Sequence, residues 1–202
     1  MLNKLRDSLQ PTMQKLGSGF ASTGLSANFW TAVGLALAFV AAGVYASTIF
    51  GVHGGIAAIA GGLLLLVSGF FDVVDGAVAR VTKQASKKGA FLDSTFDKIA
   101  EVAIFAGIAV GGLANPVLVM VALGLSLLVS YTRARAESLG VELKGIGMGE
   151  RAERMLILAI IGMIPFMPEI SFGGQMNWAV IIVSLVAGIT LIQRIVVTAS
   201  KL

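Results

Sequence analysis

The sequence predicts an all-α integral membrane protein, with six transmembrane helices preceded by one helix that lies along the membrane surface. Two observations predict this class. The 202-residue chain is 56% hydrophobic and 13% charged, about half the charged fraction of an average soluble domain. Its apolar residues also gather into six long segments, most of which approach the roughly 20 residues that a helix needs to cross a bilayer. The length suits one membrane domain over residues 1–202.

The N-terminal segment, residues 1–20, is predicted to be an amphipathic juxtamembrane helix. Five apolar residues recur there at helix-like spacing: Leu2, Leu5, Leu9, Met13 and Leu16. The basic residues between them suit lipid phosphates at the membrane surface. Pro11 interrupts the pattern, so a loose leader is the alternative.

The six apolar segments are expected to form a helix bundle over about residues 27–199. They run approximately over residues 27–50, 55–74, 91–113, 116–131, 155–167 and 178–197. The second, third and fourth should extend beyond the hydrocarbon, because their apolar periodicity continues into charged residues. The fifth is short unless it starts near Gly149.

The basic residues predict the orientation of the bundle. All fifteen fall on one side: Lys4, Arg6 and Lys15; Arg80, Lys83, Lys87, Lys88 and Lys98; Arg133, Arg135, Lys144, Arg151 and Arg154; Arg194 and Lys201. The positive-inside bias makes that side cytoplasmic, with both termini there. Topology and anionic lipid headgroups account for most of the net charge of +4, so no nucleic-acid partner is expected.

Four aspartates lie on this cytoplasmic side. Asp72 and Asp75 end the second segment, and Asp93 and Asp97 begin the third. Each pair shares one helix face, and the short connection makes the two helices antiparallel neighbours, so the four carboxylates converge. Clustered anions at this depth repel each other and need partners. Ligands that are all oxygen favour Mg²⁺ or Mn²⁺ over zinc, and such sites typically serve phosphoryl or nucleotidyl chemistry.

The residues around the aspartates complete a recognisable pattern. Gly76 lets a ligand approach the backbone closely, and Arg80 can hold a phosphate through two hydrogen bonds. Tight helix packing is the alternative explanation of Gly76 and Ala79. The pattern resembles, at the right spacing, the signature of the CDP-alcohol phosphotransferase family. Its eight positions are Asp72, Asp75, Gly76, Ala79, Arg80, Gly89, Asp93 and Asp97.

The resemblance implies an integral-membrane, usually dimeric enzyme that attacks the β-phosphate of a CDP-linked lipid with an alcohol and releases CMP. It implies that the four aspartates bind two Mg²⁺ or Mn²⁺ ions and that Asp97 is also the general base. It further implies seven residues in contact with the CDP-lipid: Asn28, Phe29, Trp30, Thr31, Gly76, Arg80 and Ser86. Ala27 stands where the family often has proline, and Asn28 has an alternative role as the cap of the first spanning helix.

Residues 130–155 indicate which alcohol is used. They carry five basic residues on the aspartate side, which suits an acceptor with its own phosphate, although the positive-inside bias is an alternative explanation. Ser-Tyr-x-Arg-Ala-Arg-Ala-Glu and Glu-Arg-x-Glu-Arg resemble the inositol-phosphate branch of the family. That branch implies four residues bound to the acceptor phosphate: Ser130, Arg133, Arg154 and Arg194. Arg194 supports this independently, because an arginine inside the last span has no topological need to be there.

The expected reaction therefore joins inositol phosphate to the lipid of CDP-archaeol or CDP-diacylglycerol at the cytoplasmic face of the cell membrane. Glycerol phosphate or serine is the alternative acceptor within the family, and serine would leave three arginines without a phosphate. A cation transporter is the alternative from another class, but it would want carboxylates near the bilayer midplane. Gly107 and Gly111 form a small-xxx-small pair that suits either a homodimer interface or packing within one chain.

Overall fold

The computed structural model describes residues 2–143, 145–164 and 176–202, with side chains from residue 11 onward. The described residues form helices joined by turns, and no strand occurs among them. This confirms the predicted all-α class. In chain order the elements are α1 (Leu2–Ala21), α2 (Ala27–Ala46), the 3-10 turn η1 (Ser47–Phe50), α3 (Gly54–Val81), α4 (Lys87–Val110), α5 (Pro116–Ser138), α6 (Arg151–Gly162) and α7 (Asn177–Lys201).

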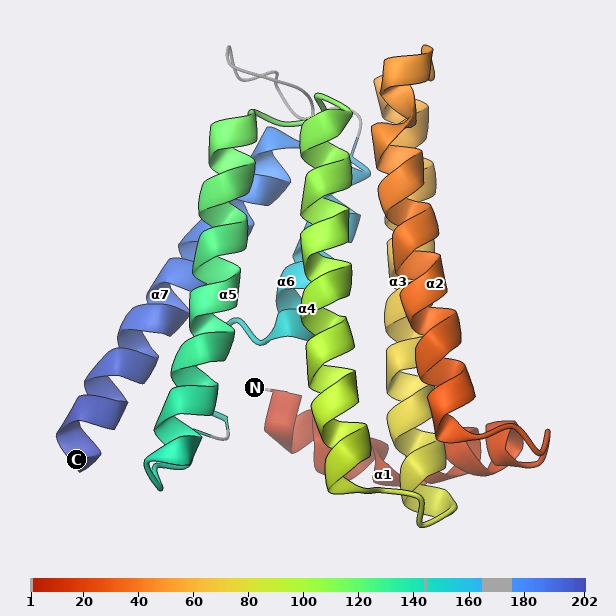
Figure 1. Cartoon of the computed structure of the whole chain (residues 1–202), viewed down its shortest axis with the longest axis vertical. Coiled ribbons are helices and arrows are strands. Elements are labelled where there is room, and N and C mark those ends of the chain that lie inside the picture. Colours follow the sequence, from red (N-terminus) through yellow and green to blue (C-terminus); the bar gives the residue numbers. More distant parts are fainter. Residues whose placement is uncertain (1, 144, 165–175) are drawn as a thin grey trace.

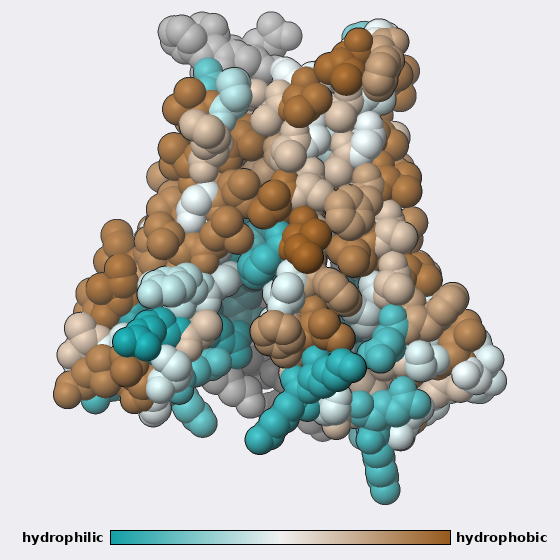
Figure 2. Space-filling model, in the orientation of Figure 1, coloured by the Kyte–Doolittle hydropathy of each residue, from teal (hydrophilic) through white to brown (hydrophobic). Residues whose placement is uncertain are grey.

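The long helices run roughly side by side, and α1 crosses below them at one end of the molecule (Figure 1). Helix α2 packs against α3 and α4, and α5 packs against α7. The short helix α6 contacts both α3 and α7, so it joins the two groups. Apolar residues cover most of the face in Figure 2, whereas polar residues gather at the end that holds α1 and reach into a hollow between the helix groups.

Four helices are long and apolar enough to cross a membrane: Ala27–Phe50, Gly54–Val81, Pro116–Ser138 and Asn177–Lys201. Helix α4 has 24 residues but carries charges within its apolar part, among them Asp97 and Glu101. Helix α6 has 12 residues and starts at Arg151, before the expected Met155. The end expected for that segment, residues 165–167, lies outside the described residues.

Three helices continue past their apolar segments, as the continued periodicity predicted. Helix α3 continues seven residues past Val74, α4 starts four residues before Phe91, and α5 continues seven residues past Tyr131. The charged residues next to each apolar run are therefore helical. The aspartates and the basic residues of α5 consequently hold fixed positions on helix faces rather than in loops.

The N-terminal segment is a continuous helix through Pro11, so the alternative of a loose leader is wrong. It lies against α3, where a Cβ atom at Gly17 would come within 2.7 Å of the Ala77 carbonyl oxygen. Leu16 and Phe20 of α1 pack against the buried Val74 and Val78 of α3. Helix α1 is thus anchored beside the segment that carries Asp72 and Asp75.

Gly107 and Gly111 pack within the chain. A Cβ atom at Gly107 would overlap the carbonyl group of Ala42, and one at Gly111 would overlap the carbonyl oxygen of Tyr45. Thr48 Oγ1 donates a hydrogen bond of 2.5 Å to the Gly111 carbonyl oxygen at the same contact. The pair therefore lets α4 approach α2 closely. Of the two alternatives for these glycines, the structure supports packing within one chain.

We expect Gly107→Ala to destabilise the protein by about 1–3 kcal/mol, because the added methyl group meets backbone atoms that cannot rotate away. Gly43→Ala on α2 is the matched control. Nothing lies within 4 Å of a Cβ atom there, and alanine favours a helix over glycine by about 0.5–1 kcal/mol. Thermal denaturation of both variants in detergent checks this, and equal midpoints would contradict the close contact.

Candidate active site

Three of the four predicted metal-binding aspartates converge between α3 and α4. One carboxylate oxygen from each of Asp72, Asp75 and Asp93 lies within 4.8 Å of the others. The turn between the helices is short, and the Ser86 side chain ends it by accepting a 3.0 Å hydrogen bond from the Gly89 amide at the start of α4. This cap places the first two turns of α4 opposite the last turns of α3.

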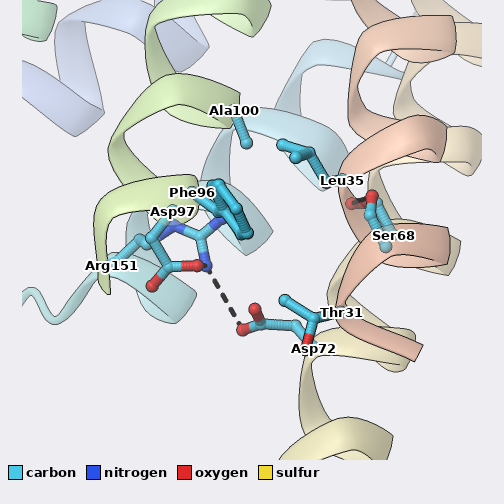
Figure 3. Close-up of a pocket in the computed structure, with 9 residues that line it drawn as sticks. Thr31, Leu35, Ser68, Asp72, Phe96, Asp97, Ala100 and Arg151 are labelled. Atoms are coloured by element: carbon cyan, nitrogen blue, oxygen red, sulfur yellow. Dashed lines mark hydrogen bonds and ion pairs between the residues drawn. The ribbon is translucent and has the colours of Figure 1, made fainter. Parts of the chain in front are cut away.

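Asp97, the fourth aspartate, is held by an arginine instead. Arg151 Nη1 lies 2.5 Å from Asp97 Oδ1 and 3.2 Å from Asp72 Oδ2, so its guanidinium group bridges α3 and α4 from the first residue of α6 (Figure 3). Arg151 is not among the residues predicted from the sequence. The available signal was its place in Glu-Arg-x-Glu-Arg, three residues before Arg154 and thus on the same helix face.

The aspartate cluster suits a divalent cation. Asp75 is 6% exposed, and its Oδ2 atom is buried without a hydrogen-bond partner among the described residues. A buried carboxylate oxygen without a partner is costly, and a cation at the cluster would remove that cost. The ligands are carboxylate oxygens, which Mg²⁺ and Mn²⁺ prefer. The residues present therefore fit the predicted cofactor.

The residues predicted to contact the CDP-lipid do not gather in one place. Thr31 lines the small pocket beside Asp72, Asp97 and Arg151, and Gly76 lies under the Arg80 guanidinium, with Arg80 Nη1 3.4 Å from the position of a Cβ atom. Trp30 instead belongs to an aromatic cluster with Phe20, Phe29 and Phe71. Asn28 is exposed.

Asn28 is not the cap of α2. Ser26 caps that helix, and its side chain accepts a 3.3 Å hydrogen bond from the Phe29 amide. The alternative role considered for Asn28 is therefore wrong. Its side chain is left at the surface beside Phe29, close in sequence to Thr31 of the acidic pocket.

An apolar cavity of about 300 Å³ adjoins the acidic cluster. Asp72, Glu101 and Arg151 contribute its charged lining, and the remainder is mostly apolar, including Val73 and Leu156. Its lining comes mainly from α3, α4 and α6. A site that offers charge next to an apolar cavity suits a ligand with a charged head and a hydrocarbon chain.

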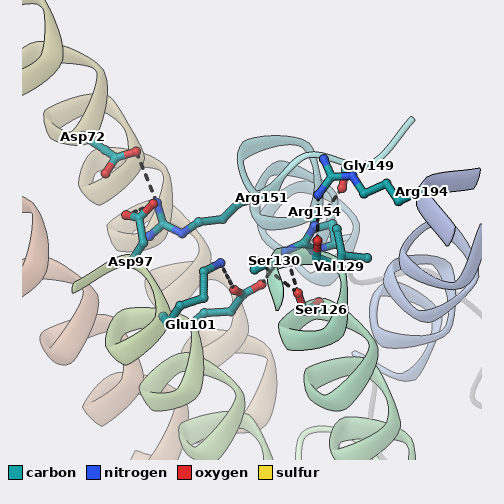
Figure 4. A network of polar contacts seen from close by, with 11 residues as sticks. Asp72, Asp97, Glu101, Ser126, Val129, Ser130, Gly149, Arg151, Arg154 and Arg194 are labelled. Carbon is teal, nitrogen blue, oxygen red and sulfur yellow. Dashed lines mark hydrogen bonds and ion pairs between the residues drawn. The ribbon is translucent and has the colours of Figure 1, made fainter. Parts of the chain in front are cut away.

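Two of the predicted acceptor-binding arginines lie near each other, deep in the bundle (Figure 4). Arg154 is 0% exposed; its Nη1 atom donates to the Gly149 carbonyl at 2.7 Å, and its Nη2 atom lies 3.1 Å from Glu101 Oε1. Arg194 is 3% exposed and donates from Nη1 to the Val129 carbonyl at 2.7 Å and from Nε to the Ile146 carbonyl at 3.1 Å. Backbone carbonyl oxygens thus accept most of the hydrogen bonds from these two guanidinium groups.

The other two predicted acceptor residues lie on α5. Ser130 Oγ donates a 3.3 Å hydrogen bond to the Ser126 carbonyl, which also accepts from Arg154 Nη2 at 3.4 Å. Ser130 therefore belongs to the same group of contacts as Arg154. Arg133 lies one turn further on; it is exposed and pairs with Glu137 at 2.9 Å. The structure thus brings three of the four residues together and leaves Arg133 at the edge, within electrostatic range of Arg194.

The family model of the CDP-alcohol phosphatidyltransferases matches residues 24–197. The chain belongs to this family. It is therefore a phospholipid-synthesising transferase, and the predicted family and enzyme class are confirmed.

Relatives within the family match over most of the chain. The archaetidylinositol phosphate synthase of Pyrococcus horikoshii is 35% identical over 96% of this chain and 95% of its own length. The enzyme of the same name from Methanothermobacter thermautotrophicus is 36% identical over 100% and 96%. The crystal structure of Mycobacterium tuberculosis phosphatidylinositol phosphate synthase with CDP-DAG bound superimposes with a TM-score of 0.74 at 25% identity, covering 92% of each chain. That enzyme's structure with manganese and citrate also gives 0.74.

Arg151→Gln should increase the stabilisation that Mn²⁺ gives to the protein. The variant removes the cation that neutralises Asp72 and Asp97, so the ligand-free form loses charge-assisted contacts of about 1.5–3 kcal/mol, which a bound divalent ion can replace. The measurement is the melting temperature with EDTA and with Mn²⁺. Arg135→Gln, at an exposed position of α5, is the control. The same Mn²⁺-induced shift in both variants would show that Arg151 does not compete with the metal.

Proposed function

We propose that this enzyme transfers the phospholipid part of CDP-archaeol, or of CDP-diacylglycerol, to a hydroxyl group of inositol phosphate and releases CMP. The observation that carries the proposal is that α6 contacts an acidic cluster at its first residue and joins a group of buried arginines one turn later. Arg151 at the start of α6 contacts Asp72 and Asp97, and Arg154, one turn later, donates to the Ser126 carbonyl of α5, which also accepts from Ser130. One helix therefore joins a nucleotide-phosphate site to a candidate acceptor-phosphate site.

The membrane arrangement proposed is a single domain over residues 1–202. It has six spans, including α4 and α6, and both termini are cytoplasmic. The positions of all fifteen basic residues support this topology. Helix α1 would lie along the cytoplasmic interface, where Figure 1 places it across the end of the bundle. The active site would then open at the cytoplasmic face, and homodimerisation is proposed from the usual state of the family.

The CDP-lipid is proposed to bind along α2 and α3. The residues that hold it would be Asn28, Phe29, Trp30 and Thr31 on α2, Gly76 and Arg80 on α3, and Ser86 at the start of α4. The 300 Å³ apolar cavity beside Asp72 suits the start of a lipid chain. Such chains contact apolar side chains alone, so the site accommodates ether-linked or ester-linked lipids by the same chemistry.

The four aspartates are proposed to hold two Mg²⁺ or Mn²⁺ ions, which when bound would neutralise and polarise the phosphate oxygens. Asp97 would accept the proton of the attacking inositol hydroxyl. A bond forms between that oxygen and the β-phosphorus, the bond from the β-phosphorus to the bridging oxygen breaks, and CMP leaves with the electron pair. The placement of Asp97 outside the group formed by Asp72, Asp75 and Asp93 supports this additional role of Asp97 as the base.

Inositol phosphate is proposed as the acceptor because its phosphate would meet Ser130, Arg133, Arg154 and Arg194. Arg154 and Arg194 donate to backbone carbonyls, and a phosphate is a charged and therefore stronger acceptor that can replace some of these contacts. The names of the relatives from Pyrococcus horikoshii and Methanothermobacter thermautotrophicus support the same acceptor. Glycerol phosphate remains the second candidate, since it carries the same phosphate.

Asp97→Asn should lower kcat by at least about 100-fold, because the general base is lost. Binding of CDP-lipid should persist, and Mn²⁺ binding should weaken less than in Asp93→Asn, since Asp72, Asp75 and Asp93 keep their geometry. Isothermal titration measures the binding of CDP-lipid and Mn²⁺, and CMP release measures turnover. Asp93→Asn is the comparison, and it should weaken Mn²⁺ binding itself. Turnover close to that of the unmodified enzyme in Asp97→Asn would refute the role of general base.

Arg194→Gln should raise the KM for inositol phosphate by about tenfold and leave the KM for CDP-lipid within twofold. The loss is that of one charge-assisted contact to the acceptor phosphate. Free inositol should be a poor acceptor for the unmodified enzyme, and the variant should discriminate less between the two. Acceptor-dependent CMP release with inositol phosphate, inositol, glycerol phosphate and serine measures this. A better rate with glycerol phosphate would replace the inositol assignment while leaving the family chemistry intact.

A further inference from the structure

Glu101 is a charged residue that the proposed reaction leaves without a role. It lies in the middle of α4 and is 0% exposed. Each of its carboxylate oxygens contacts a different cation: Oε2 lies 2.8 Å from Lys98 Nζ, and Oε1 lies 3.1 Å from Arg154 Nη2. The carboxylate therefore links two helices, α4 and α6, at a depth where few charges occur.

The position of Glu101 on α4 relates it to the acidic cluster. Asp93, Asp97 and Glu101 follow each other at intervals of four residues, so they lie along one face of the helix. The same face therefore carries a metal-cluster residue, the proposed base and the partner of Arg154. Any shift of α4 would move all three together, which keeps Arg154 in register with Asp97.

Stability alone is a weak reason to keep Glu101. Buried ion pairs are often replaceable by apolar residues without loss of stability, because removing the two charges from water costs about as much as their attraction returns. Glu101 also lines the apolar cavity beside Met155 and Leu156, where an apolar side chain would pack well. A charged side chain at this place therefore suits a role in orienting its partner better than a role in stability.

The contacts of Arg154 show what Glu101 orients. The other recorded acceptors of Arg154 are the neutral carbonyls of Gly149 and Ser126, so Glu101 contributes the negative charge that fixes this guanidinium group. The Ser126 carbonyl also accepts from Ser130, another proposed acceptor residue. Holding Arg154 thus also defines the surroundings of Ser130 (Figure 4).

We propose that Glu101 is a positioning residue of the acceptor site: its carboxylate, one turn beyond Asp97, holds Arg154 in the orientation that binds the acceptor phosphate. This rests on the proposed function of Arg154. Glu101 touches no reacting atom in this scheme. Its effect should therefore appear in the affinity for the acceptor, and it should pass entirely through Arg154.

The experiment is a double-mutant cycle on purified enzyme, with KM values for inositol phosphate and CDP-lipid and with Mn²⁺ binding measured by titration. Glu101→Gln keeps the shape and removes the charge, and it should raise the acceptor KM about tenfold. The CDP-lipid KM and the Mn²⁺ affinity should stay within twofold. Glu101→Asp keeps the charge and should give an intermediate acceptor KM. Lys98→Gln, which breaks the other ion pair of Glu101, is the matched control and should leave the acceptor KM within twofold.

The decisive comparison is made in the Arg154→Gln background. If Glu101 acts through Arg154, Glu101→Gln should change the acceptor KM less than twofold there, because coupled residues are not additive. Three results would overturn the role: effects of Glu101→Gln and Arg154→Gln on the acceptor KM that multiply in the double variant, an equal rise of the KM values for inositol phosphate and CDP-lipid in Glu101→Gln, or weakened Mn²⁺ binding in Glu101→Gln. If Glu101→Gln does not fold, Glu101→Asp with an unchanged acceptor KM overturns it equally. If Arg154→Gln itself leaves the acceptor KM unchanged, the proposed acceptor site is wrong as well. If Arg154→Gln raises the acceptor KM and Glu101→Gln does not, the acceptor site is supported and only the role of Glu101 is wrong.

Discussion

Ionised side chains inside an apolar helix bundle need opposite charges or carbonyl oxygens beside them, and the centre of this protein is organised by that requirement. Helix α4 supplies the acids and α6 supplies the arginines. Arg151 pairs with Asp97, and Arg154 pairs with Glu101. Because these pairs are one helical turn apart on both helices, they align α6 with α4 in one register. A helix of only 12 residues is thereby held in place between α3 and α7.

Close packing elsewhere makes that convergence possible. Gly107 and Gly111 allow α4 to touch the backbone of α2, and many of the buried core residues are alanines, such as Ala41 and Ala58. Small residues let helix backbones approach each other where the hydrophobic effect contributes little. The end of α4 far from the aspartates is therefore fixed by packing, whereas the end near them is fixed by charge.

The loop that precedes α6 connects the two buried arginines. The Gly149 carbonyl accepts from Arg154, and the Ile146 carbonyl accepts from Arg194. Gly147 has a φ of 108°, a conformation that favours glycine, and it lets the loop lie against α7. Residues 146–149 therefore bring together an arginine from α6 and one from α7, which approach from different sides of the bundle.

Local periodicity was enough to determine much of this protein. The apolar segments, the amphipathic first helix, and the pairing of Asp72 with Asp75 and of Asp93 with Asp97 on helix faces all follow from helical repeats within a few residues. The cap of α2 shows where local reasoning stops: Ser26 and Asn28 are both good capping residues, and the choice depends on where the helix enters the bundle.

Only the tertiary structure assigned Arg151 and Glu101. In sequence Arg151 lies 54 residues beyond Asp97, and it looks like one more residue of a basic cytoplasmic segment. Glu101 looks like one more charge in the segment that carries Asp93 and Asp97. Which opposite charges meet depends on the packing and rotation of α4 and α6 against each other, and a one-dimensional pattern of spacing contains no information about that. The sequence alone therefore determined which helices form and which carboxylates share a face, whereas helix packing decided which charges neutralise each other.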